Sequence, residues 1–264
     1  HMLDRNPCGS SSGSGAAAAA SLAAGTVGTE TNGSIICPSN VNGVVGFKPT
    51  VGLVSQDFII PISSSQDTAG PMTKTVMGAA MMLNAMATGA AKTDYAATLD
   101  AAALQGKRIG VLRGAQGSSP LIKDSFEQAL SDMESAGAIL VDIDDIDMPD
   151  GFWGKSFDVL KYEFKATLNA YLASTPDTVT TPTLADLIAF NAEHADIELA
   201  LFNQDIFEQS EGMEDLESDG YKEAVAFVQS ATRENGIDRL LAEHDVVALV
   251  APSGPLAPRA DPVN

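Results

Sequence analysis

The sequence predicts an α/β fold in which a mixed β-sheet core is flanked by helices. The clearest sign lies in the middle of the chain, where residues 108–112, 119–136 and 139–143 have the patterns of a strand, a helix and a strand. This order implies a right-handed parallel crossover. Nearer the N-terminus, a continuous apolar run at 43–47 predicts another buried strand. The alanine-rich stretch at 16–24 predicts a helix.

The first 90 residues are expected to be rich in loops. They should contain a loop over 6–14, a helix over 15–24, a short strand over 26–29, a helix or turn opened by Ser34, and the strand over 43–47. Residues 53–72 have the composition of a loop, with a short extended piece at 58–62. A helix is predicted over 75–86, and the spacing of its methionines indicates core packing rather than a ligand site. These methionines are Met77, Met81, Met82 and Met86.

Helices dominate the second part of the chain. Helical spacing of apolar residues begins at Phe157, and further elements are predicted as helices over 183–192, 197–208 and 221–243 and a buried strand over 246–250. The acidic loop at 144–151 lacks the glycine and the terminal glutamate of a calcium loop. Many aromatic residues lie in this helical part, where we expect most of them to pack between helices and a minority to line a pocket.

The charge of the chain excludes several classes of partner. The 264 residues include 35 acidic and 15 basic residues, and the net charge is −20. Because few of these lie in residues 1–90, the negative charge belongs almost wholly to residues 91–264. Such a surface repels nucleic acid and anionic membranes, so the expected partner is a small molecule or a peptide. No apolar run approaches the roughly 20 residues of a membrane span.

Metal and cofactor sites are not expected either. The three histidines have no metal-ligand spacing, and no glycine cluster is followed by the Lys-Ser/Thr pair of a phosphate loop. The two cysteines, Cys8 and Cys37, flank a pair of small-residue loops. They could lie near each other, but we interpret them as small apolar fillers. The sequence leaves the localisation open.

The small-residue stretch from Gly9 to Pro38 is the most informative part of the chain. A flexible linker would be glycine and serine throughout, whereas this stretch places a helix-forming middle between two glycine-containing loops. The first loop reads Cys-Gly-Ser-Ser-Ser-Gly over residues 8–13, and the second reads Gly-Thr-Glu-Thr-Asn-Gly-Ser-Ile over 28–35. Such a unit can bring serines that are distant in sequence to one buried point.

These motifs resemble the amidase signature family of serine hydrolases, and in particular its peptide amidase branch. The resemblance extends to Gly-Phe-Lys-Pro-Thr at 46–50 and to Ser-Gln-Asp-Thr-Ala-Gly-Pro-Met at 65–72. It implies a single amidase domain over residues 3–264, with a signature core at 3–90 and an acidic, more helical part at 91–264. His1 and Met2 are expected to be an expression remnant. We expect a piece of a longer protein, which can self-associate through exposed strand edges.

The resemblance also implies the site residues and their chemistry. Ser34 matches the nucleophile, and Ser10 matches a bridging serine that follows a cis peptide bond and lies within hydrogen-bond reach of Ser34. The backbone N–H groups of four residues match an oxyanion hole, namely Thr31, Asn32, Gly33 and Ser34. Ser11, Thr29 and Asp67 are implied to support the active loops. The implied reaction is hydrolysis of a carboxamide, non-peptide or at a peptide C-terminus, through an acyl-enzyme and without a cofactor.

A serine nucleophile needs a base, and the sequence leaves this point open. The family's base is a lysine upstream of the first loop, acting through the bridging serine, and no lysine precedes Ser10 in this chain. Lys48 is a candidate base, although its position beside Pro49 at a strand end favours a structural role. Lys74 is the other lysine to consider if the chain as given is active. Two alternatives remain: a catalytically inactive binding module on the same fold, and an esterase of the α/β-hydrolase type that uses Ser11 in its Gly-x-Ser-x-Gly motif.

Overall fold

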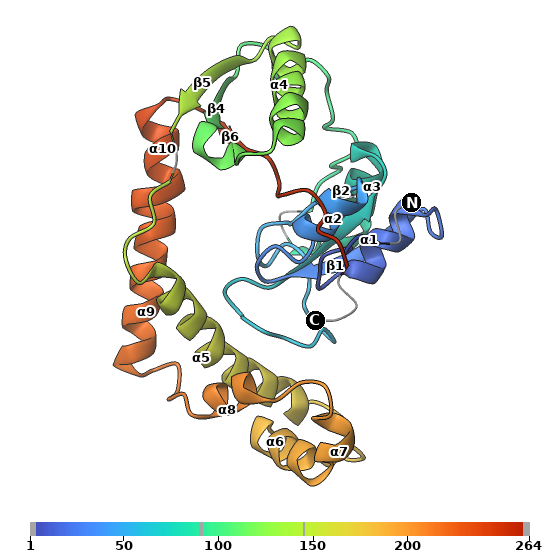
Figure 1. Ribbon diagram of the computed structural model, residues 1–264, viewed down its shortest axis with the longest axis vertical. Helices are drawn as coiled ribbons and strands as arrows, with labels where there is room; N and C mark the ends of the chain where they lie inside the picture. The colour runs from blue at the N-terminus through green and yellow to red at the C-terminus, as the bar shows by residue number, and fades with distance from the viewer. Residues whose placement is uncertain (1–3, 90–91, 145, 261–264) are drawn as a thin grey trace. The chain divides into compact units, whose positions relative to one another are not determined.

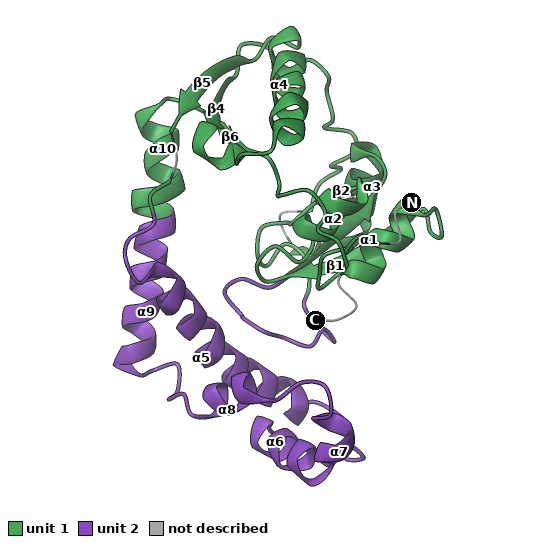
Figure 2. Ribbon diagram, in the orientation of Figure 1, with its two compact units in different colours: residues 1–55, 68–147, 233–264 green, residues 56–67, 148–232 purple. Residues whose placement is uncertain are grey.

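The computed structural model describes residues 4–89, 92–144 and 146–260. The chain forms two compact units (Figure 2). Unit 1 comprises residues 1–55, 68–147 and 233–264, and unit 2 comprises residues 56–67 and 148–232. Asp145 of the expected acidic loop lies outside the described residues. The expectation of one amidase domain stays a prediction.

An antiparallel sheet organises the first part of unit 1 (Figure 1). Its strands are β1 (Gly25–Glu30), β2 (Val45–Gly46) and β3 (Thr68–Thr73), in the order β1-β3-β2. Three helices contact these strands, namely α1 (Ser12–Ala19), α2 (Ile36–Asn42) and α3 (Val76–Met86). The predicted strand at 26–29 and the helix opened after Ser34 are thereby confirmed.

The central strand of this sheet, β3, was expected to be loop in all but its last residue. All six of its residues are buried, and Gly70 and Pro71 give it the composition of a turn rather than of a strand. Pro71 has no N–H to donate, but its carbonyl accepts a hydrogen bond from Phe47 N at 3.1 Å. A Cβ at Gly70 would lie 2.1 Å from Phe47 O, so the close approach of the two chains requires glycine.

Two further expectations for this region are wrong in detail. Helix α1 begins at Ser12 and ends at Ala19, whereas the alanine composition predicted a helix over 15–24. Soon after its end, Ser21 adopts a left-handed backbone conformation, with φ 61°, which cannot continue a helix. On α3, Met77 and Met81 are exposed and the buried positions belong to Ala79, Ala80 and Leu83. The buried face of α3 is thus formed by other side chains, and these two methionines do not pack in the core.

A parallel sheet forms the second part of unit 1. Its strands are β4 (Arg108–Leu112), β5 (Ile139–Ile143) and β6 (Ala248–Val250), in the order β5-β4-β6. Helix α4 (Pro120–Ser135) connects β4 to β5 after a short 3-10 helix, η2 (Arg113–Gln116). Val111, Phe126 and Leu130 form a buried cluster between this helix and the sheet. The predicted strand–helix–strand crossover is confirmed.

Unit 2 is built from helices (Figure 2). They are α5 (Phe152–Ala173), α6 (Leu184–Glu193), α7 (Ala195–Glu198), α8 (Asp205–Glu211) and α9 (Asp219–Gln229). The single helix predicted over 197–208 is wrong, because the chain leaves α7 at Leu199 and exposes Leu201 and Phe202 before α8. After α9, a π-helical stretch, η3 (Ser230–Ile237), leads into α10 (Asp238–Glu243), with non-helical dihedrals at Gly236.

A buried carboxylate holds unit 2 together. Glu163 of α5 is fully buried and accepts hydrogen bonds from the Ser63 hydroxyl, from Ser65 N at 3.0 Å and from the Tyr221 hydroxyl at 2.7 Å. Burial, with the neighbouring Glu163 carboxylate, raises the pKa of the Tyr221 hydroxyl well above its usual range. Glu163 therefore ties the 62–67 turn and α9 to α5.

Within the described ranges, no helix combines the length and apolar character needed to span a bilayer. The same residues contain no cluster of three histidine, cysteine or acidic side chains arranged to hold a metal ion.

Candidate functional site

Two loops of unit 1 carry the predicted site residues. The first, residues 8–11, precedes α1 and contains Ser10, and the second, residues 31–34, joins β1 to α2 and ends at Ser34. The peptide bond between Gly9 and Ser10 is cis, as predicted. Ser10 is exposed and Ser34 is half-buried. The second loop therefore lies between two regular elements, and the first loop leads directly into α1.

Ser11 joins the first loop to the strand that leads into the second. Its hydroxyl donates a hydrogen bond to Thr29 O and accepts one from Thr29 N, each at 3.0 Å. Its backbone N–H donates to Ser34 O at 3.2 Å. These bonds bring together Ser11, Thr29 and Ser34, three of the predicted site residues. The contact expected between the Ser10 and Ser34 hydroxyls stays a prediction.

The two cysteines form a disulfide, so their interpretation as apolar fillers is wrong. Cys8 and Cys37 are 29 residues apart in the sequence, and their Cα atoms are 5.9 Å apart. Cys8 lies two residues before Ser10 and Cys37 three residues after Ser34. The disulfide therefore crosslinks the start of the first loop to the first turn of α2, just after the second loop. The sequence showed that the cysteines flank the loops but not that the loops lie side by side.

Glu30 is a residue of this region that the motif match did not single out. It is the last residue of β1 and only 6% exposed. Its Oε2 atom accepts hydrogen bonds from Ile35 N at 2.7 Å and Ile36 N at 2.9 Å. Within the loop that these bonds span, Gly33 has φ +83°, a conformation that glycine adopts without strain. Glu30 lies within the quoted motif at 28–35, but the motif does not specify which groups its carboxylate contacts.

The remaining predicted residues lie elsewhere. Asp67 is in unit 2, where its Oδ2 atom accepts hydrogen bonds from Ile62 N at 2.7 Å and Ser63 N at 2.9 Å, so it closes the turn before β3. Its expected support of the active loops stays a prediction. Lys48 is half-buried. Lys74 is exposed, and its ammonium group donates to the Ser21 hydroxyl.

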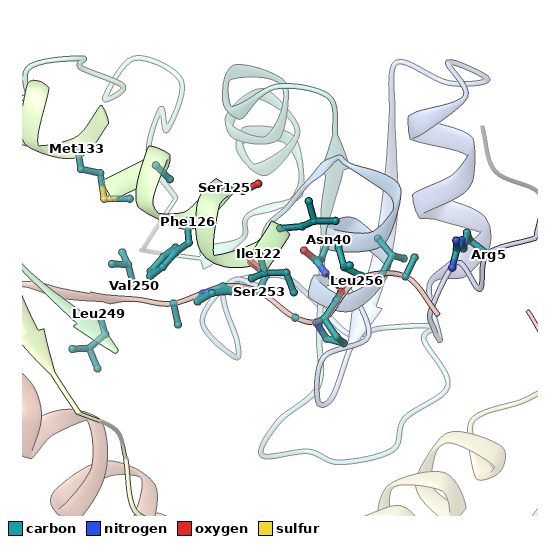
Figure 3. Close-up of a pocket in the computed structure, with 18 residues that line it drawn as sticks. Arg5, Asn40, Ile122, Ser125, Phe126, Met133, Leu249, Val250, Ser253 and Leu256 are labelled. Atoms are coloured by element: carbon teal, nitrogen blue, oxygen red, sulfur yellow. Dashed lines mark hydrogen bonds between the residues drawn. The ribbon is translucent and has the colours of Figure 1, made fainter. Parts of the chain in front are cut away.

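A cavity of about 1020 Å³ in unit 1 is separate from these loops (Figure 3). It is lined mostly by apolar side chains of α4, among them Ile122 and Phe126, and by the chain from Leu249 to Ala257. On its α2 side, the Asn40 amide donates to Pro255 O at 3.2 Å. Neither Ser10 nor any residue of 31–34 lines it. Its size alone does not make it the site, because the chemically distinctive residues lie in the two loops.

Comparison with known proteins shows the family. The amidase family model matches residues 1–261. A probable amidase of Arabidopsis thaliana is 36% identical over 273 aligned positions, which cover 95% of this chain and 50% of the plant protein. A putative amidase of Arthroderma benhamiae is 45% identical over 157 positions, covering 54% of this chain and 26% of its own length.

Solved structures share the fold. The native peptide amidase of Stenotrophomonas maltophilia is 41% identical, with a TM-score of 0.85 over 95% of this chain and 53% of its own. An amidase family protein of Bacillus anthracis is 33% identical, with a TM-score of 0.80 over 93% of this chain and 49% of its own. The chain thus spans about half the length of these relatives. It belongs to the amidase signature family, and its mixed α/β architecture is that family's fold.

Proposed function

We propose that the protein hydrolyses carboxamide bonds, with Ser34 as the nucleophile. The proposal rests on the contacts that hold the two loops together. Ser11 N donates to Ser34 O, Ser11 Oγ bonds to the backbone of Thr29, and the disulfide joins the start of the first loop to the first turn of α2. Family membership supports the reaction class. A serine hydroxyl becomes reactive only beside a base and an oxyanion-binding group, and both require a fixed loop geometry.

The proposed mechanism uses both loops. Ser34 Oγ attacks the carbonyl carbon, and its proton passes to Ser10, which passes its own proton to a lysine. The N–H groups of residues 31–34 bind the negative oxygen of the tetrahedral intermediate, where one donor is worth roughly 100- to 1000-fold in rate. The C–N bond then breaks, the amine leaves with a proton, and water hydrolyses the acyl-enzyme. We propose that this lysine lies upstream of the first loop, as the resemblance implies.

The substrate class follows from the relatives and the charge. The Stenotrophomonas maltophilia relative is a peptide amidase, so we propose the C-terminal amide of a peptide as substrate, with a small-molecule amide as the broader class. The net charge of −20 favours a neutral or cationic substrate over an anionic one.

The hydrogen bonds of the Ser11 hydroxyl support Ser34 rather than Ser11 as the nucleophile, because that hydroxyl is bonded to both backbone groups of Thr29. In addition, the chain just before Ser11 forms only an isolated β-bridge, at Arg5, whereas a nucleophile elbow follows a strand directly. An inactive binding module on this fold is an outcome that the following experiment distinguishes.

The test measures release of ammonia from a C-terminal peptide amide. A form of the protein that carries the proposed lysine should hydrolyse the amide, and in that form Ser34→Ala should abolish hydrolysis while Ser11→Ala retains some. The 264-residue chain should hydrolyse activated esters slowly and unactivated amides not detectably, because a general base typically contributes about 100- to 10,000-fold. Rapid amide hydrolysis by the 264-residue chain would show that another residue, with Lys48 or Lys74 tested first, is the base. Full activity of Ser34→Ala would refute the proposal.

A further inference from the structure

The buried carboxylate of Glu30 forms unusual contacts next to the second loop. At 6% exposure, an ionised side chain needs strong hydrogen-bond partners to offset its lost hydration. Glu30 Oε2 obtains two, from the N–H groups of Ile35 and Ile36, at 2.7 and 2.9 Å. Hydrogen bonds from backbone N–H groups to a carboxylate are roughly twice as strong as neutral ones. These two hydrogen bonds therefore stabilise the conformation of the second loop.

The two N–H groups lie at the start of α2. The first N–H groups of a helix have no partner within the helix, and a polar side chain at the N-cap usually satisfies one of them. Here the N-cap residue is Ile35, which has no polar side chain and makes no side-chain cap. Glu30 takes this role from five residues upstream, and its negative charge also suits a helix N-terminus.

The same bonds close the second loop. Residues 31–34 lie between the backbone of Glu30 and the two N–H groups that its side chain accepts. Cys37 N donates to Gly33 O at 2.7 Å, which holds the loop from the α2 side. The carboxylate thereby commits the N–H groups of Ile35 and Ile36 to the fold rather than to a substrate oxygen.

We propose that Glu30 is a positioning residue for the hydrolytic reaction. Its carboxylate fixes the loop 31–34, and with it the Ser34 hydroxyl and the N–H groups of the oxyanion hole, in the reactive arrangement. This rests on the proposed function, since positioning matters only if the loop is reactive. Glu30 acts through the loop backbone and does not touch the substrate.

The chain offers a matched control. Glu163 is also a buried glutamate that accepts a backbone N–H, that of Ser65 at 3.0 Å, but it lies in unit 2. Glu30→Leu removes every acceptor from the side chain, and Glu30→Gln keeps one acceptor oxygen but removes the charge. Glu163→Gln makes the same chemical change in the other unit.

Two measurements are made on the 264-residue chain for each variant. The first is the rate constant for labelling of Ser34 by a fluorophosphonate, per folded molecule. We expect it to fall about 100-fold in Glu30→Leu, about 10-fold in Glu30→Gln, and by less than about twofold in Glu163→Gln. The second is hydrogen exchange of the amides in residues 31–36, which should be faster in the Glu30 variants only.

The outcomes separate this proposal from the proposed function. Unchanged labelling and unchanged exchange in Glu30→Leu would overturn the positioning role, as would an equal fall in labelling in Glu163→Gln. If the wild-type chain is not labelled, exchange alone decides the role of Glu30: acceleration confined to 31–36 supports it, and uniform acceleration contradicts it. If Glu30→Leu does not fold, labelling and exchange are compared between Glu30→Gln and its control, Glu163→Gln.

Discussion

The Ser11 hydroxyl bonds to both backbone groups of Thr29, donating to its carbonyl and accepting from its N–H at 3.0 Å each. One side chain thus links the end of the first loop to the strand β1. The neighbouring glycine, Gly28, makes this approach possible, because a Cβ there would lie 3.0 Å from Ser11 Oγ and 2.7 Å from Met72 Sδ. The first loop is therefore placed by backbone contacts near the end of β1.

Ser11→Ala should weaken this placement without removing the nucleophile. We expect a loss of about 1 kcal/mol in the free energy of unfolding, measured by urea denaturation, and a fall of about tenfold in fluorophosphonate labelling, since the loop that carries Ser10 loosens. An esterase centred on Ser11 would instead lose all labelling. Ser14→Ala is a suitable control, because the Ser14 hydroxyl also donates to a β1 carbonyl, that of Val27 at 2.8 Å, but lies outside the first loop.

The disulfide should contribute measurably to stability. Crosslinking two residues 29 positions apart restricts the unfolded chain, and loops of this length correspond to about 3–4 kcal/mol. Urea unfolding before and after treatment with a dithiol reductant should show this difference. The Cys8→Ser/Cys37→Ser double variant should match the reduced wild type and show no response to the reductant. Equal stability of the oxidised and reduced chains would contradict the crosslink.

The raised pKa of Tyr221 predicts a loss of stability at high pH. The ordinary tyrosine pKa is about 10, and burial with the contact to Glu163 raises it in the folded state. Above about pH 10 the unfolded chain releases this proton while the folded chain retains it, so this contribution to stability, complete below that pH, is lost as the pH rises. Urea denaturation at a series of pH values should show the decline, and Tyr221→Phe should reduce its slope. An unchanged slope in Tyr221→Phe would contradict the assignment.

The sequence predicted the elements correctly where the local residue pattern matches the way the element packs in the fold. The apolar runs ending at Leu112 and Ile143, with the amphipathic segment between them, predicted β4, β5 and α4 because each pattern matches the period of its element. Strand β3 was not predicted because Gly70 and Pro71 are residues typical of turns. In the structure they make close contact with Phe47, which the sequence pattern does not reveal. Its conformation is imposed by the two strands on either side of it.

Only those features of the candidate site that belong to the sequence motif were predictable. The motif match predicted the cis peptide bond before Ser10 and selected Ser10 and Ser34 as candidate residues, whereas the disulfide and the contacts of Glu30 depend on which segments meet in space. Neither a cysteine spacing of 29 residues nor a lone glutamate specifies its partner. The same reason explains why α1 ended early: alanine content favours a helix but does not determine where the chain must turn.

Gly70→Ala tests the packing of the unpredicted strand. The added methyl group would lie 2.1 Å from Phe47 O, so the strands must separate, at a cost of about 2–3 kcal/mol in the free energy of unfolding. Gly13→Ala is the control, since no atom lies within 4 Å of the added group and the residue is inside α1. It should stabilise the protein by about 0.5–1 kcal/mol. Thermal or urea unfolding measures both, and equal effects would show that β3 is not packed as described.

The most direct test of the central claim is to locate the covalent adduct of a fluorophosphonate by peptide mass spectrometry. A serine oxygen forms the bond to phosphorus as fluoride leaves, so the modified residue identifies the nucleophile. The reaction should modify Ser34 in the wild-type 264-residue chain and should not occur in Ser34→Ala, while Ser12→Ala, which alters the hydroxyl that donates to Cys8 O, should still be labelled at Ser34. An adduct on Ser11 or on any other residue, or equal labelling of Ser34→Ala, would contradict the assignment of Ser34 as the nucleophile.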